Sequence, residues 1–309
     1  MRRSLGRRPQ WLSVVLYALF LLGSLGPAQA EPEQRIVSLN PSLTAILVAI
    51  GAGDRLVGVD DFSARSQPAV AHLPRVGGLY NTSLESIAAL SPDLVVLVPS
   101  AEQRDLRARL AEFDVDVLEL DPVGFDDVLE TIETLGSRAG RAAPARQRVA
   151  EIRRVRRVVE AARLPSTRGV LVLQRDPLFV VGRGSFVDDM LRSVGVENLA
   201  AVFDEPYPRV SREWLIDVAP DTLLDSSQSE GDAHDYWSKW PSIPAVRKNR
   251  VVTLPRGLAT LPGPRLDLAL LVLAEAVHGK EAIAQLMNAA ASEPGEVADP
   301  KTEPRDAVE

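Results

Sequence analysis

Two glutamates recur in matched surroundings in the two halves of the chain. Residues 83–96 and 211–224 match over fourteen positions without a gap. Each segment begins with serine, has glutamate two residues later, and has Pro-Asp seven residues after that glutamate. Serine is a favourable N-cap and glutamate suits the first turn, so each segment predicts a helix followed by a strand. Glu85 and Glu213 could merely stabilise these helices, or together they could engage a partner that is itself two-fold symmetric.

Several aromatic side chains could bind a flat ligand. Phe62 and Tyr207 lie in loops next to predicted strands, where α/β proteins hold ligands, and Tyr80 follows Gly77-Gly78 on an expected surface loop. Core packing is the competing interpretation for Phe62 and Tyr207, whereas ligand contact is favoured for Tyr80. The full set of candidate ligand-binding residues is Phe62, Tyr80, Arg175, Phe179, Tyr207 and Trp237.

The remaining members of that set have their own alternatives. Arg175 could pair with an anionic ligand group or remain a solvated loop arginine. Phe179 lies within a strand-like run, where packing into the core competes with ligand contact. Trp237 is left open between the two roles, whereas Trp240 is expected to pack structurally.

Histidine and cysteine are too scarce for a protein-bound metal centre. The chain has no cysteine and only His72, His234 and His278, of which His278 ends the last predicted helix. A zinc or manganese site would need several histidines and carboxylates that converge, so we expect no metal ligands and no cofactor. His234 could still be an axial ligand to a chelated metal, or it could be solvated.

Motifs for catalysis are missing as well. The sequence has no G-x-S-x-G nucleophile elbow, no P-loop and no dinucleotide fingerprint. We therefore expect a binding protein with no catalytic residues. The alternatives are a secreted α/β enzyme and a ligand sensor that shares the fold of such a binding protein but takes no part in transport.

The elements that position these residues alternate in the manner of an α/β protein. Short apolar, β-branched segments are separated by stretches with helical spacing, which indicates largely parallel sheets. The predicted strands are 36–39, 56–59, 94–98, 115–120, 169–173, 178–181, 222–224 and 251–254, and a helix is predicted over 266–278. Arginine-rich residues 144–163 have valine and isoleucine at helical spacing and predict one long, solvated helix, with a basic partner-binding helix as the alternative.

These patterns divide the chain into five parts. Residues 1–30 have four arginines, an apolar run and Ala28-Gln29-Ala30, which predicts a cleaved signal peptide. An N-terminal lobe (31–142), a connecting backbone helix (143–165), a C-terminal lobe (166–290) and a disordered tail (291–309) follow. Arg2-Arg3 leaves open whether export uses the general or the twin-arginine route.

The charge of the chain bears on its partners and its location. The formal net charge is −7, and it is more negative without the four signal arginines, so nucleic acid is not an expected partner. Without a cysteine there is no lipidation site at the cleavage point. We expect a periplasmic monomer with no direct membrane anchor.

Five segments in order resemble one family, the helical-backbone periplasmic binding proteins that include the vitamin B12, siderophore and haem receptors. The segments are RIVSLNPSLTAIL (35–47), LVGVDDFS (56–63), LPRVGGLYNTSLESIAALSPDLVV (73–96), PYPRVSREWL (206–215) and LPGPRL (261–266). The resemblance implies two Rossmann-like lobes that are joined by one rigid helix and hold a ligand between them. It also implies an ABC permease dimer with ATPase subunits, whose arginines receive Glu85 and Glu213.

The resemblance is closest to the cobalamin branch, whose aromatic side chains enclose the corrin. Phe62, Phe179 and Tyr207 match aromatic positions of that branch. Leu79-Tyr80, Val98 to Ser100, and Leu173 stand where further aromatic rings are expected. The implied ligand is therefore a metal chelate: cobalamin or another corrinoid first, then a ferric siderophore, then haem.

Overall fold

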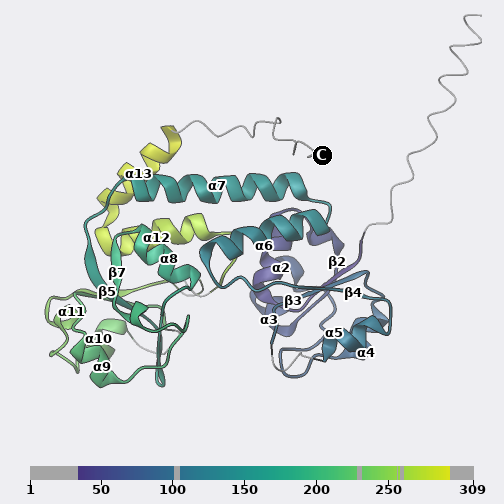
Figure 1. Cartoon of the computed structure of the whole chain (residues 1–309), viewed down its shortest axis with the longest axis horizontal. Helices are drawn as coiled ribbons and strands as arrows, with labels where there is room; N and C mark the ends of the chain where they lie inside the picture. Colours follow the sequence, from purple (N-terminus) through teal and green to yellow (C-terminus); the bar gives the residue numbers. More distant parts are fainter. Residues whose placement is uncertain (1–33, 101–104, 228–231, 256, 258–260, 293–309) are drawn as a thin grey trace, which may run out of the picture. The chain divides into compact units, whose positions relative to one another are not determined.

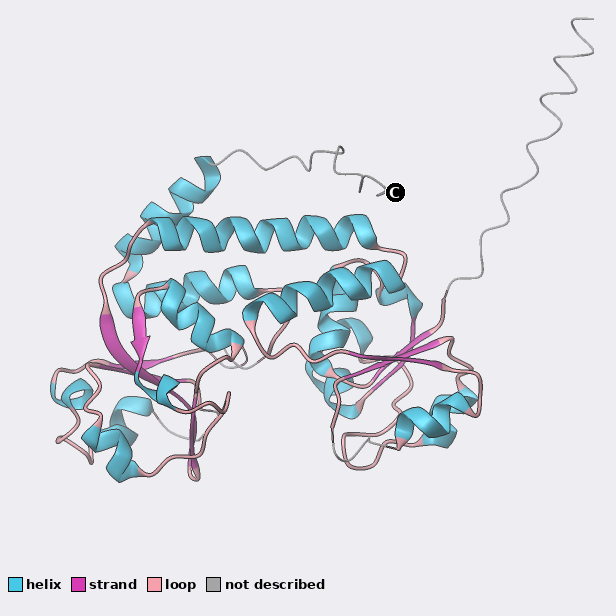
Figure 2. Ribbon diagram, viewed as in Figure 1, coloured by secondary structure: helices cyan, strands magenta, loops and turns pink. Residues whose placement is uncertain are grey.

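The computed structural model describes residues 34–100, 105–227, 232–255, 257 and 261–292 (Figure 1). The predicted signal peptide lies outside this described part, as does the predicted tail from residue 293 on. Each half of the described chain has its own sheet with helices against it (Figure 2). The fold is therefore two α/β lobes, as the alternation of elements predicts.

A parallel four-stranded sheet forms the centre of the first lobe. Its strand order is β2-β1-β3-β4, and β1 pairs in register with β3 from Ile36 opposite Leu94. Its strands are β1 (Ile36–Ser38), β2 (Leu56–Val59), β3 (Leu94–Leu97) and β4 (Asp116–Glu119).

Helices cover both faces of this sheet. In β3, Leu94 and Val96 face one apolar core, whereas Val95 and Leu97 face another. The unbroken apolar run of this strand reflects burial on both sides. The helices of the lobe are α2 (Pro41–Ala49), α3 (Asp61–Ser66), α4 (Leu84–Ala89), α5 (Leu106–Ala111) and α6 (Phe125–Arg138).

The second lobe has a mixed sheet in the order β6-β5-β8-β9, with β7 also paired to β5. Its strands pair in parallel except for β5 with β6, so the sheet is largely parallel as expected, with one antiparallel pair at its edge. Only Asp176 and Pro177 separate these two strands, and so short a connection allows only an antiparallel hairpin. The strands are β5 (Thr167–Arg175), β6 (Leu178–Val180), β7 (Val196–Asn198), β8 (Thr222–Asp225) and β9 (Val251–Thr253).

The helices of the second lobe include one that follows the helix predicted to be last. The predicted helix at 266–278 is present as α12, but α13 follows it, so His278 does not end the final helix. The helices are α8 (Phe186–Ser193), α9 (Arg212–Asp217), α10 (Ala233–Trp237), α11 (Pro244–Arg247), α12 (Leu266–His278) and α13 (Lys280–Ser292). None of the helices in the described ranges is both long and apolar enough to cross a bilayer.

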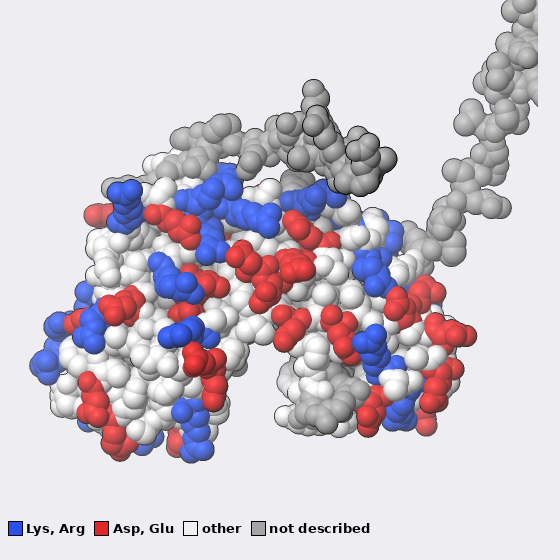
Figure 3. Space-filling view, in the orientation of Figure 1, with Lys and Arg blue, Asp and Glu red and all other residues white. Residues whose placement is uncertain are grey.

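One long helix, α7 (Ala142–Ala161), connects the lobes. It ends before the expected residue 165, because Arg163 adopts a left-handed conformation (φ 47°) and Pro165 follows it. Arginines gather along the outer face over α7 (Figure 3). Within α7, Arg156 pairs with Asp126 of α6 and with Glu160. The basic face is partly neutralised within the protein, as expected for a solvated connecting helix.

One of the hydrophobic cores extends through both lobes. α7 packs against α6 of the first lobe and against α12 and α13 of the second. Ile36 and Leu94 of the first sheet, Val155 of α7 and Leu224 of the second sheet belong to one contiguous buried cluster. Because packed cores resist deformation, this arrangement makes the connection between the lobes stiff.

Candidate functional site

A pocket of about 480 Å³ is lined by residues of both lobes. Most of its wall is apolar, and it includes two prolines from the segment after β4 and the segment before α12. The lining residues are Asn40, Pro41, Ser42, Val98, Asp121, Pro122, Val123, Leu173, Tyr207, Leu261 and Pro262. The volume lies within the range of small-molecule binding sites.

Strand ends position much of this wall. Asn40 follows β1, Val98 follows β3, and Asp121 follows β4, so the first lobe contributes the carboxyl edge of its parallel sheet. Ligands of open α/β sheets bind at this edge. The Asn40 side chain also caps α2 and accepts hydrogen bonds from the N–H groups of Ser42 (2.8 Å) and Leu43 (3.4 Å).

The segment after β4 is fixed to the second lobe beside the pocket. The Val123 carbonyl accepts a hydrogen bond from the Phe186 N–H (2.7 Å), and Asp189 accepts one from the Phe125 N–H (3.1 Å). These bonds cross between the two halves of the chain. They hold the pocket wall in place before any ligand binds.

Tyr207 is the aromatic ring of the pocket. Its side chain is 42% exposed, and burial of the phenol raises its pKa above the ordinary value. The hydroxyl is therefore a neutral donor and acceptor at physiological pH. Asp121 is the one charged residue among the described lining residues, so the wall presents no cationic side chain there.

Two predicted pocket positions meet Tyr207 in this wall. Val98 and Leu173 come from different lobes, and the resemblance to the cobalamin branch placed aromatic rings at both. Here both are aliphatic. The pocket thus has one aromatic ring among its described lining residues, whereas the resemblance implies several.

Phe62 and Tyr80 lie outside the described pocket wall. Phe62 is 55% exposed on α3, with the Arg65 guanidinium 4.8 Å from its ring centre. Tyr80 is 83% exposed on the loop that precedes α4. The structure leaves both rings accessible but does not bring them together with Tyr207.

Arg175 and Trp237 are buried inside the second lobe rather than exposed to a ligand. Trp237 is 1% exposed and belongs to the core of this lobe, and its Nε1 donates to Asp225 Oδ2 at 2.6 Å. Arg175 donates to the same oxygen at 2.9 Å. These bonds give both side chains a structural role, because a buried carboxylate needs hydrogen-bond donors.

Phe179 is half-buried in β6 at the edge of the second sheet. It pairs with Gln174 of β5 and forms an isolated bridge with Arg209. This ring lies outside the described pocket wall as well. Sequence reasoning, in turn, did not select Asn40, Asp121 or Leu261, although their places after strands or inside the family segments pointed to them.

Glu85 and Glu213 occupy equivalent and exposed positions. Each lies in the first turn of a six-residue helix, α4 or α9, and each helix is capped by a serine. The Ser83 side chain caps α4 by accepting a hydrogen bond from the Ser86 N–H, as the sequence predicts. Neither glutamate is buried, so both carboxylates can reach a partner.

The match between the two segments extends to backbone detail. Ser91 (φ 44°) and Ala219 (φ 49°) both adopt the left-handed conformation just before Pro-Asp. The N–H of Asp93 donates to the Arg35 carbonyl at 2.9 Å, and the N–H of Asp221 donates to the Arg168 carbonyl at 2.9 Å. The internal repeat in the sequence is therefore a repeat of structure.

The Glu213 carboxyl is held in its charged form. A hydrogen bond from its own backbone N–H and a second one from the Ser211 hydroxyl lower its pKa below the ordinary value. Hydrogen bonds to a carboxylate favour ionisation. Glu213 therefore offers a persistent negative charge on the surface.

Histidine does not form a metal site in the described part of the chain, where no group of three potential ligands converges. Nε2 of His278 donates a hydrogen bond to the Val194 carbonyl at 2.7 Å, which connects the end of α12 with the C-cap of α8. His234 lies in the first turn of α10, where its N–H donates to Asp232.

Known proteins resemble this chain over most of its length. A profile of the family described as periplasmic binding protein matches residues 36–258. The vitamin B12-binding protein of Vibrio parahaemolyticus is 28% identical over 265 residues, which cover 85% of this chain and 95% of that protein. An uncharacterized ABC transporter substrate-binding lipoprotein of Bacillus subtilis is 28% identical over 257 residues, or 80% of this chain and 81% of that protein.

Solved structures also resemble this chain over most of its length. The crystal structure of a periplasmic heme-binding protein from Pseudomonas aeruginosa superposes with a TM-score of 0.67 at 28% identity. The match covers 79% of this chain and 92% of that one. The two-lobed α/β fold is thus common to this chain and its structural relative.

Proposed function

Because the chain belongs to the periplasmic binding protein family, we propose that it is the substrate-binding component of an ABC importer and captures a metal chelate between its lobes. Its relatives are binding proteins rather than enzymes. The single observation that supports the proposal best is the 480 Å³ pocket, whose wall is shared by the two lobes.

A corrinoid is the proposed ligand, ahead of a ferric siderophore and haem. The first support is the relative from Vibrio parahaemolyticus, whose name states that it binds vitamin B12. The second is the wall itself, which is mostly apolar and has Asp121 as its one charged residue in the described part. Corrin side chains end largely in neutral amides, whereas haem has two carboxylates that would need cationic partners.

Delivery of the ligand depends on the two glutamates. We assign Glu85 and Glu213 to dock on the two subunits of a dimeric permease, through charge-assisted pairs with arginines. Their equivalent positions on the two lobes support this assignment, since a two-fold partner presents the same surface twice. The chain would reach the periplasm through residues 1–30 as a cleaved signal peptide.

Titration of the purified mature protein tests the ligand assignment. Cyanocobalamin, ferrichrome and haem are added separately, while absorbance and intrinsic tryptophan fluorescence are followed. We expect one cyanocobalamin per chain with a Kd of about 1 μM or tighter, and weaker binding of the other two compounds. A preference for ferrichrome or haem would overturn the corrinoid assignment, and no binding of any metal chelate would overturn the proposed class of ligand.

A further inference from the structure

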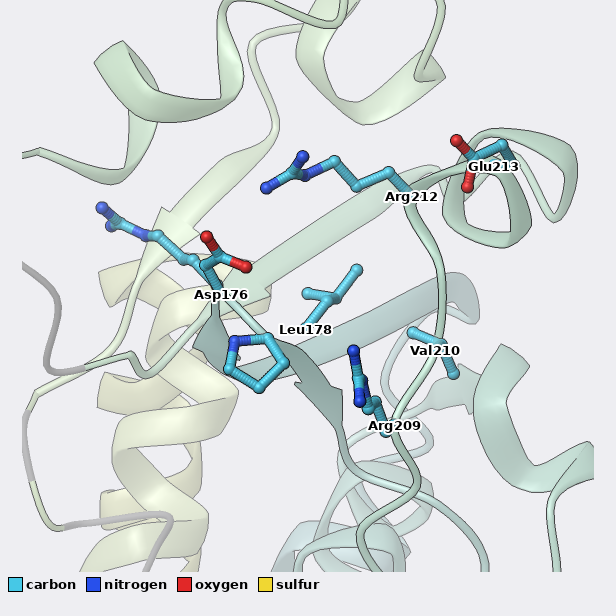
Figure 4. Close-up of a pocket in the computed structure, with 8 residues that line it drawn as sticks. Asp176, Leu178, Arg209, Val210, Arg212 and Glu213 are labelled. Carbon is cyan, nitrogen blue, oxygen red and sulfur yellow. The ribbon is translucent and has the colours of Figure 1, made fainter.

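A charged hollow lies beside Glu213 on the surface of the second lobe (Figure 4). Its volume is about 190 Å³, which is enough for one or two polar side chains but far less than the ligand pocket. The β5–β6 turn and the segment that leads into α9 form its walls. The lining residues are Arg175, Asp176, Pro177, Leu178, Arg209, Val210, Arg212 and Glu213.

Two exposed arginines distinguish this hollow. Neither Arg209 nor Arg212 forms an ion pair with any residue in the described ranges. The Arg212 guanidinium lies 5.3 Å from the ring centre of Trp240, a contact that restricts its side chain. Figure 4 shows Arg212 extending toward the Asp176 side of the hollow, with Glu213 at the opposite end, on α9.

The first lobe has no counterpart of this cationic pair. By the match of Ser83 to Ser211, Asn81 stands in the place of Arg209 and Leu84 in the place of Arg212. The Asn81 side chain accepts a hydrogen bond from the Gly78 N–H at 2.8 Å, and Leu84 packs on the core of the first lobe. The repeat thus keeps the glutamate in both lobes and adds two cations in only one.

We infer that the second lobe docks through a surface of both signs, in which Glu213 receives a basic side chain of the permease and the hollow between Arg209 and Arg212 receives an acidic one. This inference rests on the proposed function. Arg175 is already paired with Asp225, so Arg209 and Arg212 face one further carboxylate of the wall, Asp176, and the hollow apart from Glu213 has an excess of positive charge. This excess suits an incoming carboxylate, because guanidinium groups bind carboxylates through charge-assisted hydrogen bonds. With this additional contact, the two lobes present different surfaces to a two-fold symmetric permease. The second lobe can then dock on its permease subunit in only one orientation.

The test measures docking of the purified full-length mature protein to its permease–ATPase complex in nanodiscs. We expect the double variant Arg209→Glu/Arg212→Glu to dock roughly tenfold more weakly or worse, because two attractive charges become repulsive. Arg209→Lys/Arg212→Lys keeps the charge and should recover most of the affinity. Arg146→Glu, an exposed arginine on α7, is the matched control for a general effect of charge and should leave docking unchanged.

Failure of this inference and failure of the docking assignment give different results. Docking of the Arg209→Glu/Arg212→Glu variant within twofold of the wild type would overturn the inference, provided that Glu213→Arg weakens docking as the proposed function requires. If neither Glu85→Arg nor Glu213→Arg affects docking, the docking assignment itself fails and this inference fails with it.

Unchanged cyanocobalamin affinity and melting temperature in all variants would show that the effect lies at the membrane partner. Saturable binding of 1 mM inorganic phosphate, lost in the double variant, would instead make the hollow a small-anion site.

Discussion

Arg175 and Asp225 form an ion pair inside the second lobe, with Nε 2.9 Å from Oδ2 and side chains that are 4% and 1% exposed. Trp237 donates to the same carboxylate oxygen, and the Ser227 N–H donates to the other one at 2.9 Å. The carboxylate lies at the end of β8, and Arg175 lies at the end of β5. The network therefore connects the ends of two neighbouring strands with α10.

Loss of one partner from this network should destabilise the protein. Arg175→Leu leaves the buried Asp225 carboxylate without its cation, and we expect the free energy of unfolding to fall by about 3 kcal/mol. Urea unfolding measures this loss. Lys248→Ala is the control, because it removes the exposed pair with Asp221 and should cost less than about 1 kcal/mol. Equal losses in the two variants would contradict the structural role of Arg175.

Tyr207 should contribute to ligand affinity through its ring. We expect Tyr207→Ala to weaken cyanocobalamin binding roughly tenfold, because the ring lines the pocket and is proposed to stack on the corrin. Tyr207→Phe separates the ring from the hydroxyl and should retain most of the affinity. Fluorescence titration measures both variants. Tyr80→Ala, outside the described wall, should have a smaller effect, and the opposite order would move the ligand site to the loop before α4.

Glu85 and Glu213 should matter for transport but not for ligand capture. The double variant Glu85→Arg/Glu213→Arg should abolish uptake of radiolabelled cyanocobalamin in cells that depend on this receptor, since both docking charges become repulsive. Its ligand affinity in solution should equal that of the wild type. Glu112→Arg/Glu130→Arg reverses two other exposed charges of the first lobe and should leave uptake intact. Uptake by the Glu85→Arg/Glu213→Arg variant would refute the docking assignment.

The ionisation of Glu213 should depend on Ser211. The lowered pKa means that the carboxyl titrates below the ordinary value of about 4.3, and any stability it contributes is present above that value and lost as the pH falls through the lowered pKa. Ser211→Ala removes one of the two hydrogen bonds and should raise the midpoint. Carbon-13 NMR of the side-chain carboxyl measures it. An unchanged midpoint would show that the hydroxyl does not contribute.

Ligand binding should change the separation of the lobes only slightly. The hydrophobic core that α6, α7 and α12 share resists hinge motion. We therefore expect the distance between the lobes to change by less than about 2 Å. The chain has no cysteine, so spin labels at Glu112→Cys and Arg247→Cys report this distance without interference. A shift of several ångströms on addition of cyanocobalamin would contradict a stiff connection.

The sequence by itself determined the two-lobed α/β architecture, the long helix and the equivalence of Glu85 with Glu213. These features follow from local patterns: apolar runs of strand length, helical spacing and the serine, glutamate and Pro-Asp spacing that sets where a helix starts and stops. The match between the two halves is visible in the sequence itself, without knowledge of long-range contacts. The predicted strands overlap β1 to β6, β8 and β9, whereas β7 was not predicted, because its three residues, Val196 to Asn198, include only one apolar side chain.

The tertiary structure alone decided which candidate side chains share a site. Arg175 is separated by 50 residues from Asp225, the partner that makes it structural, and Val98, Leu173 and Tyr207 come together only when the strand ends of both lobes meet. Burial and proximity of this kind depend on how distant elements pack, so local spacing could not separate Tyr207 in the pocket from Trp237 in the core. The same holds for the arginine-lined hollow, which requires the β5–β6 turn to pack beside the start of α9.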